Sequence, residues 1–152
     1  MLEVAFPALV HGVYVITTRA GDRINGMTAA WVSQVSLNPV QITVAIAPSR
    51  YTHSLIKESG IFAVNVLTSS QVELGKRFGY KSGRKIDKFA GLEWTSATTG
   101  APILPQAHAY LDTRLIHTYE VGDHTLFVGD VVDARILHPQ TQPLIFKKSD
   151  FF

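Results

Sequence analysis

The feature that most constrains the fold of this chain is a series of about six or seven β-rich runs, interrupted by only two short helical patterns. The clearest runs are rich in β-branched and aromatic residues and cover 11–18, 41–47, 61–67, 107–119 and 125–137. A weaker run covers 26–35. Because the helical patterns are too few for a βαβ repeat, the sequence predicts a mainly-β fold, an antiparallel Greek-key-like barrel.

Turn signals separate these runs. Residues 19–25 supply Gly, Asp and Asn for a first hairpin turn, and Asn38-Pro39 marks a bend. Gly122-Asp123-His124 is typical of a hairpin turn between the last two runs. The segment 80–89 is polar, basic and contains glycine, so we expect a loop there.

Two short helices are expected between the strands. The first begins at Tyr51, runs for about two turns, and ends before Gly60, which stands in the usual C′ position. The second opens with a capping box formed by Ser70 and Glu73 and is stopped by Gly79.

The length of 152 residues is typical of one domain, so we expect a single domain over 1–152. The absence of cysteine excludes disulfides and thiolate ligands, and it fits a cytoplasmic chain. No secretory signal and no apolar run of roughly 18 residues is present, so no membrane association is expected. A hydrophobic share of 46% against 17% charged residues predicts that an oligomer interface buries the surplus apolar surface.

The usual motifs of several reaction classes are missing. The chain has no GxGxxG after its first strand, no GxxxxGK[ST] and no GxSxG, so Rossmann, P-loop and hydrolase chemistry are not indicated. Its six histidines include no HExxH motif and no close pair, so no metal site is predicted.

The stretch from Gly26 to His53 carries the strongest chemical signal. Small residues in its first part allow a flat ligand to approach the backbone. Ser49, Arg50 and Thr52 then stand just ahead of the first helix, where hydroxyls, a guanidinium and a helix N-terminus suit a phosphate. Together they predict a phosphorylated, planar cofactor.

Five blocks, in this order, resemble the flavin reductase family with the FMN-binding split-barrel fold: GVYVITT at 12–18, GMTA at 26–29, VSLNP at 35–39, FAVNVL at 62–67 and GDHTLFVGDV at 122–131. The resemblance covers nearly the whole chain. It implies a homodimer that binds FMN or FAD near the subunit interface and, in many members, takes hydride from NADH or NADPH.

The resemblance also assigns roles to individual residues. The isoalloxazine ring would lie along Met27, Thr28, Ala29, Ala30, Trp31, Val32 and Ser33. The ribityl-phosphate would lie near Ser49, Arg50, Tyr51, Thr52 and His53, with Lys88 and Phe89 closing the pocket. His124, with Gly122 and Asp123, would lie by the nicotinamide as the catalytic residue.

Each assignment has a plainer alternative. Thr28 and Ser33 fit ordinary strand positions, and Trp31 fits a core or a dimer interface. Arg50 fits a solvated turn, and His124 fits a β-turn. The basic residues Lys76, Arg77, Lys81, Arg84, Lys85 and Lys88 fit a solvated face or a nucleic-acid patch, although phosphate attraction explains them as well.

The sequence therefore predicts an FMN-binding NAD(P)H-dependent flavin oxidoreductase that transfers hydride from nicotinamide to flavin N5, with no nucleic-acid partner. We predict FMN as the cofactor in place of FAD, because the short chain offers no evident adenine pocket. A monooxygenase is one acceptor that the family uses. The alternative is a flavoredoxin-like electron carrier or FMN-storage protein, which the stretches AAWVSQVS and RYTHSLI favour. A third reading is a split-barrel relative that binds no flavin and uses its basic loop on nucleic acid.

Overall fold

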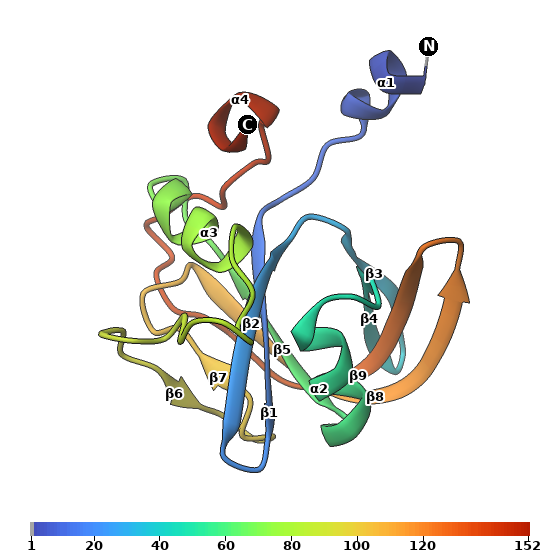
Figure 1. The fold of residues 1–152 in the computed structure, drawn as a ribbon, viewed down its shortest axis with the longest axis vertical. Coiled ribbons are helices and arrows are strands. Elements are labelled where there is room, and N and C mark those ends of the chain that lie inside the picture. The colour runs from blue at the N-terminus through green and yellow to red at the C-terminus, as the bar shows by residue number, and fades with distance from the viewer. Residues whose placement is uncertain (1) are drawn as a thin grey trace.

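A computed structural model describes residues 2–152 and contains a seven-stranded antiparallel sheet that curls into an open barrel (Figure 1). The predicted mainly-β, antiparallel architecture is confirmed. The strand order is β2-β1-β5-β8-β9-β4-β3. The strands are β1 Tyr14–Ala20, β2 Arg23–Ala29, β3 Val32–Leu37, β4 Val40–Ile46, β5 Ile61–Val66, β8 Ala109–Val121 and β9 His124–Ile136; β6 (Thr95–Ser96) and β7 (Pro102–Ile103) form a separate small sheet.

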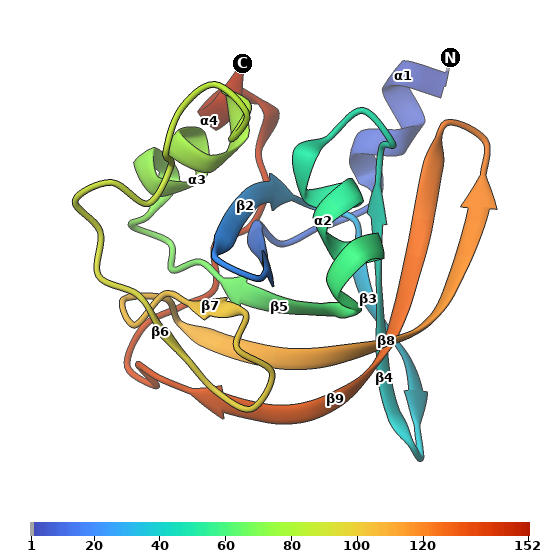
Figure 2. The same ribbon diagram turned by 60° about the horizontal axis from the view of Figure 1, so that its bottom comes forward.

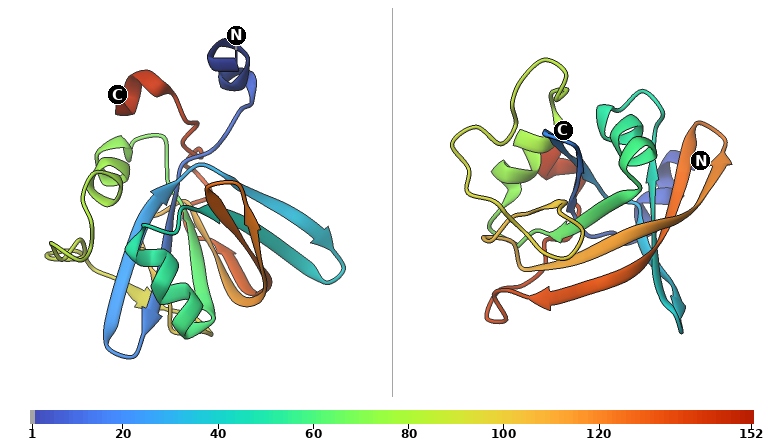
Figure 3. Two further views of the ribbon diagram at one scale, coloured as in Figure 1. Left: turned by 45° about the vertical axis from the view of Figure 1, so that its right-hand side comes forward. Right: turned by 90° about the horizontal axis from the view of Figure 1, so that it is seen from below.

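The barrel is split between its two edge strands. Strands β2 and β3 follow one another in the chain but do not pair, and Ala30 and Trp31 connect them. Figure 3 shows the β1–β2 and β3–β4 hairpins diverging from this connection. The segment 26–35, expected as one weak strand, is therefore divided between two strands at opposite edges of the sheet.

The long β8–β9 hairpin joins the two halves of the barrel. One end of β8 pairs with β5, from Ile61 opposite Arg114 to Val66 opposite Ala109. The other end of the hairpin, on β9, pairs with β4. Its turn at Gly122 has φ 57°, as expected for the hairpin turn predicted there.

Helix α2 (Tyr51–Ser59) lies within the curve of the sheet (Figure 2). Leu55 and Ile56 of this helix are buried, and Ile56 packs in the barrel interior with Ile16, Val44, Phe62 and Phe127. The helix ends at Gly60, whose φ of 72° is left-handed and whose N–H bonds to Ile56 O at 2.8 Å. The predicted first helix is confirmed.

The predicted first turn is too long. Strand β1 continues to Ala20 and β2 begins at Arg23, so only Gly21 and Asp22 form the turn. Asn25, which was read as a turn residue, is a buried strand residue. Its polar side chain is tolerated there because its amide donates to Thr52 Oγ1 at 2.8 Å.

The predicted capping box is wrong. Helix α3 (Val72–Gly79) has Gln71 as its N-cap, and that residue makes no side-chain capping bond. The Gln71 amide instead accepts from Thr68 N–H at 2.8 Å and donates to Gln106 O at 2.8 Å. Gly79 belongs to the helix and Tyr80 caps it. One local and one tertiary hydrogen bond of the Gln71 side chain stand at this helix start in place of the predicted box.

The C-terminal tail is partly sheltered, as its apolar residues require. Leu144 and Phe151, the latter in α4 (Lys148–Phe151), are buried in a cluster with Val13, Val15 and Phe78. Phe152 remains 87% exposed. The N-terminal α1 (Leu2–Ala5) and η1 (Phe6–Ala8) are exposed on the same side of the molecule as the C-terminus (Figure 1). None of the helices within 2–152 has the length and apolarity needed to cross a membrane.

Gly129 in β9 is expected to tolerate no side chain. A Cβ at this position would lie 2.3 Å from Thr113 Cγ2 and 2.6 Å from Arg114 O, and the backbone oxygen cannot rotate away. Gly129→Ala should lower the free energy of unfolding by about 2 kcal/mol or more, the cost of overpacking. Urea denaturation measures it.

Gly122→Ala is the matched control, because that site has open space around it but a φ of +57°. It should cost only about 1 kcal/mol, the penalty of a left-handed conformation. Equal effects of the two substitutions would contradict the steric explanation.

Candidate functional site

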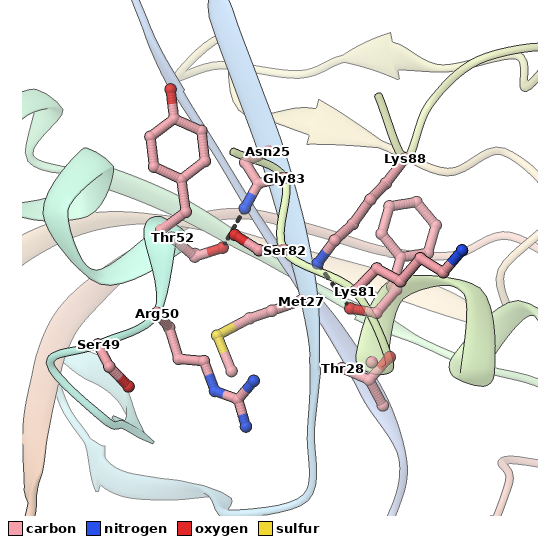
Figure 4. A pocket seen from close by; sticks show the side chains of 13 residues that line it. Asn25, Met27, Thr28, Ser49, Arg50, Thr52, Lys81, Ser82, Gly83 and Lys88 are labelled. Carbon is pink, nitrogen blue, oxygen red and sulfur yellow. Dashed lines mark hydrogen bonds between the residues drawn. The ribbon is translucent and has the colours of Figure 1, made fainter. Parts of the chain in front are cut away.

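A polar cleft lies where strand β2, the N-terminus of α2, the end of α3 and the loop 80–88 converge (Figure 4). The loop follows α3 directly, so these segments come from three separate parts of the chain that the barrel topology brings together. The cleft is lined by Asn25, Met27, Thr28, Ser49, Arg50, Tyr51, Thr52, Phe78, Gly79, Lys81, Ser82, Gly83 and Lys88.

A more apolar cavity adjoins the polar cleft. Thr28, Arg50 and Gly79 line both cavities. The rest of its lining consists of small residues and aromatic rings: Val13, Ala29, Ala30, Gly75, Tyr80, Phe146, Phe151 and Phe152. The end of β2 and the connection to β3 thus run from a polar compartment into an apolar one.

Lys88 supplies a buried positive charge to the cleft. Only 5% of the residue is exposed, and its ammonium donates to Gly26 O at 3.0 Å and to Phe78 O at 2.9 Å. Burial, aided by the nearby charge of Arg50, lowers the pKa of Lys88 from 10.5 to about 8. The residue therefore ties β2 to the end of α3 and carries a proton that an anion in the cleft would stabilise.

The N-terminus of α2 faces the same cleft. Its N-cap, Arg50, makes no side-chain capping bond, and the first N–H groups of a helix lack intrahelical partners. Ser49 and Arg50 are exposed, and Thr52 is buried and held by Asn25. Figure 4 shows the Arg50 guanidinium lying in the cleft beside Met27. This combination is suited to an anion such as a phosphate.

Strand β2 forms the wall shared by the two compartments. Thr28 Oγ1 donates to Gly75 O at 2.5 Å, so its hydroxyl proton is used to hold α3. Met27, Ala29 and Ala30 are half-buried. The small side chains after Thr28 leave the strand backbone open to close approach by a flat group.

Four of the residues predicted to bind the cofactor line neither compartment: Ser33, His53, Phe89 and Trp31, the last of which is described below. His53 is buried, with Nε2 2.8 Å from Thr125 Oγ1 and its ring against Phe127. Phe89 is buried against Phe78. Ser33 is exposed on β3, where its hydroxyl donates to Gln34 O at 3.0 Å.

Trp31 and His124 meet at a separate position. Their ring centroids are 4.9 Å apart, and neither residue lines the polar cleft. His124 Nδ1 lies 2.7 Å from Asp123 Oδ1, and this hydrogen bond and the charge of His124 lower the pKa of Asp123. Because the adjacent Thr125 pairs with Ile46, His124 lies near the end of β4, three residues before Ser49.

The basic residues noted in the sequence do not form one patch. Lys81 and Lys88 line the cleft, whereas Lys76 pairs with Glu73 at 3.5 Å. The Arg77 guanidinium is used internally, since it donates to Lys88 O at 2.8 Å and also to Ala90 O. Within 2–152, no group of three His, Asp or Glu side chains is placed to hold a metal ion.

Sequence reasoning gave no site role to Asn25, Phe78, Gly79, Ser82 and Gly83, and it pointed to Lys81 only as one of a basic run that phosphate attraction would explain. Most lie on α3 and the following loop, which are far in sequence from the 26–53 stretch. The one available signal was the glycine within the basic loop, because Gly often marks a close backbone approach.

An antiparallel split barrel with this cleft beside its open edge defines a class of flavin-binding proteins, and the comparisons identify the family. The model of the flavin reductase like domain matches residues 6–152. The chain belongs to this family.

Two curated relatives show the range within it. The ferric-chelate reductase (NAD(P)H) of Archaeoglobus fulgidus is 38% identical over 135 residues, which are 88% of this chain and 80% of that protein. The high molecular weight rubredoxin of Moorella thermoacetica is 38% identical over 93% of this chain. The present chain spans only 62% of the rubredoxin's length.

Two solved structures are also similar. The NADH:FAD oxidoreductase of Streptomyces globisporus C-1027 superimposes with a TM-score of 0.88 at 30% identity, covering 96% of this chain and 86% of that one. The flavoredoxin of Methanosarcina acetivorans superimposes with a TM-score of 0.84 at 28% identity, covering 93% and 82%. Reductases and a flavoredoxin thus share the fold of this chain.

The buried charge of Lys88 is expected to make stability depend on pH. Its pKa is about 8 in the folded protein and 10.5 as the ordinary value, so between these values the unfolded chain binds more protons. The free energy of unfolding should therefore rise with pH across that window, by up to about 3 kcal/mol. Below about pH 8 the protein carries the full cost of burying the charge of Lys88.

Urea denaturation from pH 7 to 10 measures this rise against the Lys88→Met variant, which should lack it. Lys81→Met removes an exposed lysine of the same cleft and should keep the pH dependence. Parallel profiles for the unsubstituted protein and Lys88→Met would contradict the pKa assignment.

Proposed function

We propose that this protein is a flavin-dependent NAD(P)H oxidoreductase that binds FMN across the two adjoining compartments. The observation that carries the proposal is that a cation-rich polar cleft continues into an apolar cavity along one strand, with Thr28, Arg50 and Gly79 common to both. FMN has the same arrangement, a charged phosphate at one end and a flat, largely apolar ring at the other.

The polar cleft holds the phosphate. Arg50 and Lys88 supply positive charge, Ser49 and Thr52 supply hydroxyls, and the uncapped start of α2 supplies backbone N–H groups. Charge-assisted hydrogen bonds of this kind are the stronger ones in proteins. The buried Lys88 also keeps β2 at a fixed distance from the end of α3, so the cleft is preorganised.

The residues from Met27 to Ala30 lie along the ring. The small side chains of Ala29 and Ala30 let it approach the strand, and the aromatic residues of the apolar cavity flank its far side. A bound flavin would supply the hydride-accepting chemistry, at N5, and that chemistry is the cofactor's own. The chain supplies binding and orientation.

His124 is proposed to act on the nicotinamide side of this site. With Nδ1–H donated to Asp123, its Nε2 is free to hold a proton or a hydrogen bond at the reacting pair. Trp31 packs beside the imidazole and restricts its orientation. His53, Ser33 and Phe89 are not part of the proposed contact set, because each side chain is engaged elsewhere.

We include a homodimer in the proposal. Apolar side chains remain exposed on β3 and on the distal part of the β8–β9 hairpin: Val35, Leu37, Ile116, Tyr119 and Val121. A second copy would cover them and would approach the neighbouring position where Trp31 and His124 meet. A monooxygenase is one class of acceptor that fits a flavin reductase.

A flavin-binding electron carrier is the second candidate. The similarity to a flavoredoxin and to a high molecular weight rubredoxin favours it. The two functions differ in one property, which is the rate at which pyridine nucleotides reduce the bound flavin.

An anaerobic absorbance experiment separates these functions. Protein loaded with FMN is mixed with NADH and then with NADPH, and bleaching of the flavin bands within seconds is expected. Bands that persist until dithionite is added would contradict the reductase and favour the carrier. A protein that binds no added FMN would contradict both.

His124→Ala should slow the reduction about a hundredfold, the smaller end of the effect of a positioned acid or base. His117→Ala, an exposed histidine on the same hairpin, is the control and should reduce normally. Unchanged reduction by His124→Ala would remove this residue from the mechanism.

Arg50→Ala should weaken FMN binding about tenfold to a hundredfold, the effect of losing a charge-assisted hydrogen bond. Calorimetric titration with FMN and with riboflavin, which lacks the phosphate, measures the difference. Riboflavin affinity should change little. Arg19→Ala, an exposed arginine on β1, serves as control. An equal loss for both ligands would place Arg50 against the ring instead.

A further inference from the structure

We propose that Arg84 makes this site selective for a flavin that ends in a single phosphate, FMN, over the dinucleotide FAD. It does so by latching the loop 80–88 across the polar end of the cleft. The inference rests on the proposed function, because it concerns the same cleft. The sequence pointed to Ser49 and Tyr51 as phosphate-site residues and to Arg84 only as one of a run of basic residues; their mutual contacts are seen in the structure.

The latch consists of two contacts made by one side chain. Arg84 Nη1 donates to Ser49 O at 3.0 Å. Its guanidinium carbon also lies 4.9 Å from the centre of the Tyr51 ring, within the range of a cation–π interaction. Ser49 and Tyr51 flank Arg50 at the start of α2, so Arg84 joins the loop directly to the proposed phosphate site.

The residue next to the latch closes the remaining space. A Cβ on Gly83 would lie 2.0 Å from Asn25 Oδ1, so the loop backbone packs directly on the Asn25 side chain. Asn25 is itself held by Thr52. Figure 4 shows Gly83 and Ser82 beside Asn25 and Thr52 at one end of the cleft.

The base of the loop is fixed as well. Lys88 binds the backbone of both β2 and α3, and Arg77 binds Lys88 O at 2.8 Å. Within the loop, the N–H groups of Arg84 and Lys85 bond to the Ser82 hydroxyl and carbonyl at 3.2 and 3.0 Å. The tip of the loop is thus a formed turn, and its position over the cleft depends on the contacts of Arg84 and Gly83.

This closure affects the two flavins differently. The terminal phosphate of FMN needs only the space between Arg50, Lys88 and the start of α2. FAD must carry a second phosphate and an adenosine beyond that point, where Ser82 and Gly83 form the wall. FAD therefore binds only when the Arg84 contacts break, and the cost of breaking them lowers the affinity for FAD alone.

The test is calorimetric titration of the full-length protein and its variants with FMN and with FAD. The unsubstituted protein should prefer FMN. Arg84→Ala should reduce the ratio of FMN to FAD affinity about fivefold or more, chiefly by tighter FAD binding, because one cation–π contact and one hydrogen bond are lost. Gly83→Ala, which forces the loop off Asn25, should act in the same direction. Lys85→Ala removes the same charge from the same loop and should leave the ratio unchanged.

An unsubstituted protein that binds FMN and FAD equally would overturn the inference while leaving the proposed function standing. An affinity ratio that stays constant in both Arg84→Ala and Gly83→Ala would do the same. An equal change in Lys85→Ala would reassign the effect to charge and overturn the latch. Failure of the unsubstituted protein to bind either flavin would overturn the proposed function and the selectivity together.

Discussion

The two hydrogen bonds from the buried ammonium of Lys88 are the interaction on which the site depends. They join Gly26 O, on the edge strand β2, to Phe78 O, near the end of α3. Strand β2 has a paired neighbour on one side only, so its other edge needs a partner. The Lys88 ammonium donates to Gly26 O on that edge, so no further strand is added there. The space beside the ammonium stays open for a ligand. The same burial lowers the pKa of Lys88, because it destabilises the charged ammonium. An anion bound in the cleft would offset that loss of free energy.

The split of the barrel has a related consequence. Because β2 and β3 do not pair, Ala30 is released from the sheet, and its small side chain lines the apolar cavity beside Ala29 at the end of β2. The long β8–β9 hairpin compensates by pairing with strands of both halves, which keeps the open edge from spreading. Rigidity on the closed side of the barrel and access on the open side therefore arise from one topology. Sites built on strands and helix ends of this kind are held more precisely than sites built on loops alone.

Much of the fold followed from local patterns, and much of the site did not. Neighbouring residues in the sequence are enough to predict three elements: the hairpin turn at Gly122, the helix that ends at Gly60 and the strand at 61–66. The capping box at Ser70 failed because Gln71 finds partners at Thr68 and Gln106, and Gln106 is distant in sequence. His53 stands within the predicted binding stretch, yet its place on the helix turns it toward Thr125 in the core. A sequence motif shows only which residues are neighbours along the chain. The geometry of the helix decides which of their side chains face a cavity.

The sequence by itself determined the fold class, the family and the strand and helix start that supply half of the cleft, because these depend on periodicity, turn residues and contiguous blocks. Only the tertiary structure decided the other half. It placed Lys81, Ser82 and Gly83 opposite Arg50, set Arg84 against Tyr51, and paired Trp31 with His124. The physical reason is that each of these contacts joins segments more than thirty residues apart. Their meeting depends on strand order and barrel closure, which no local pattern encodes.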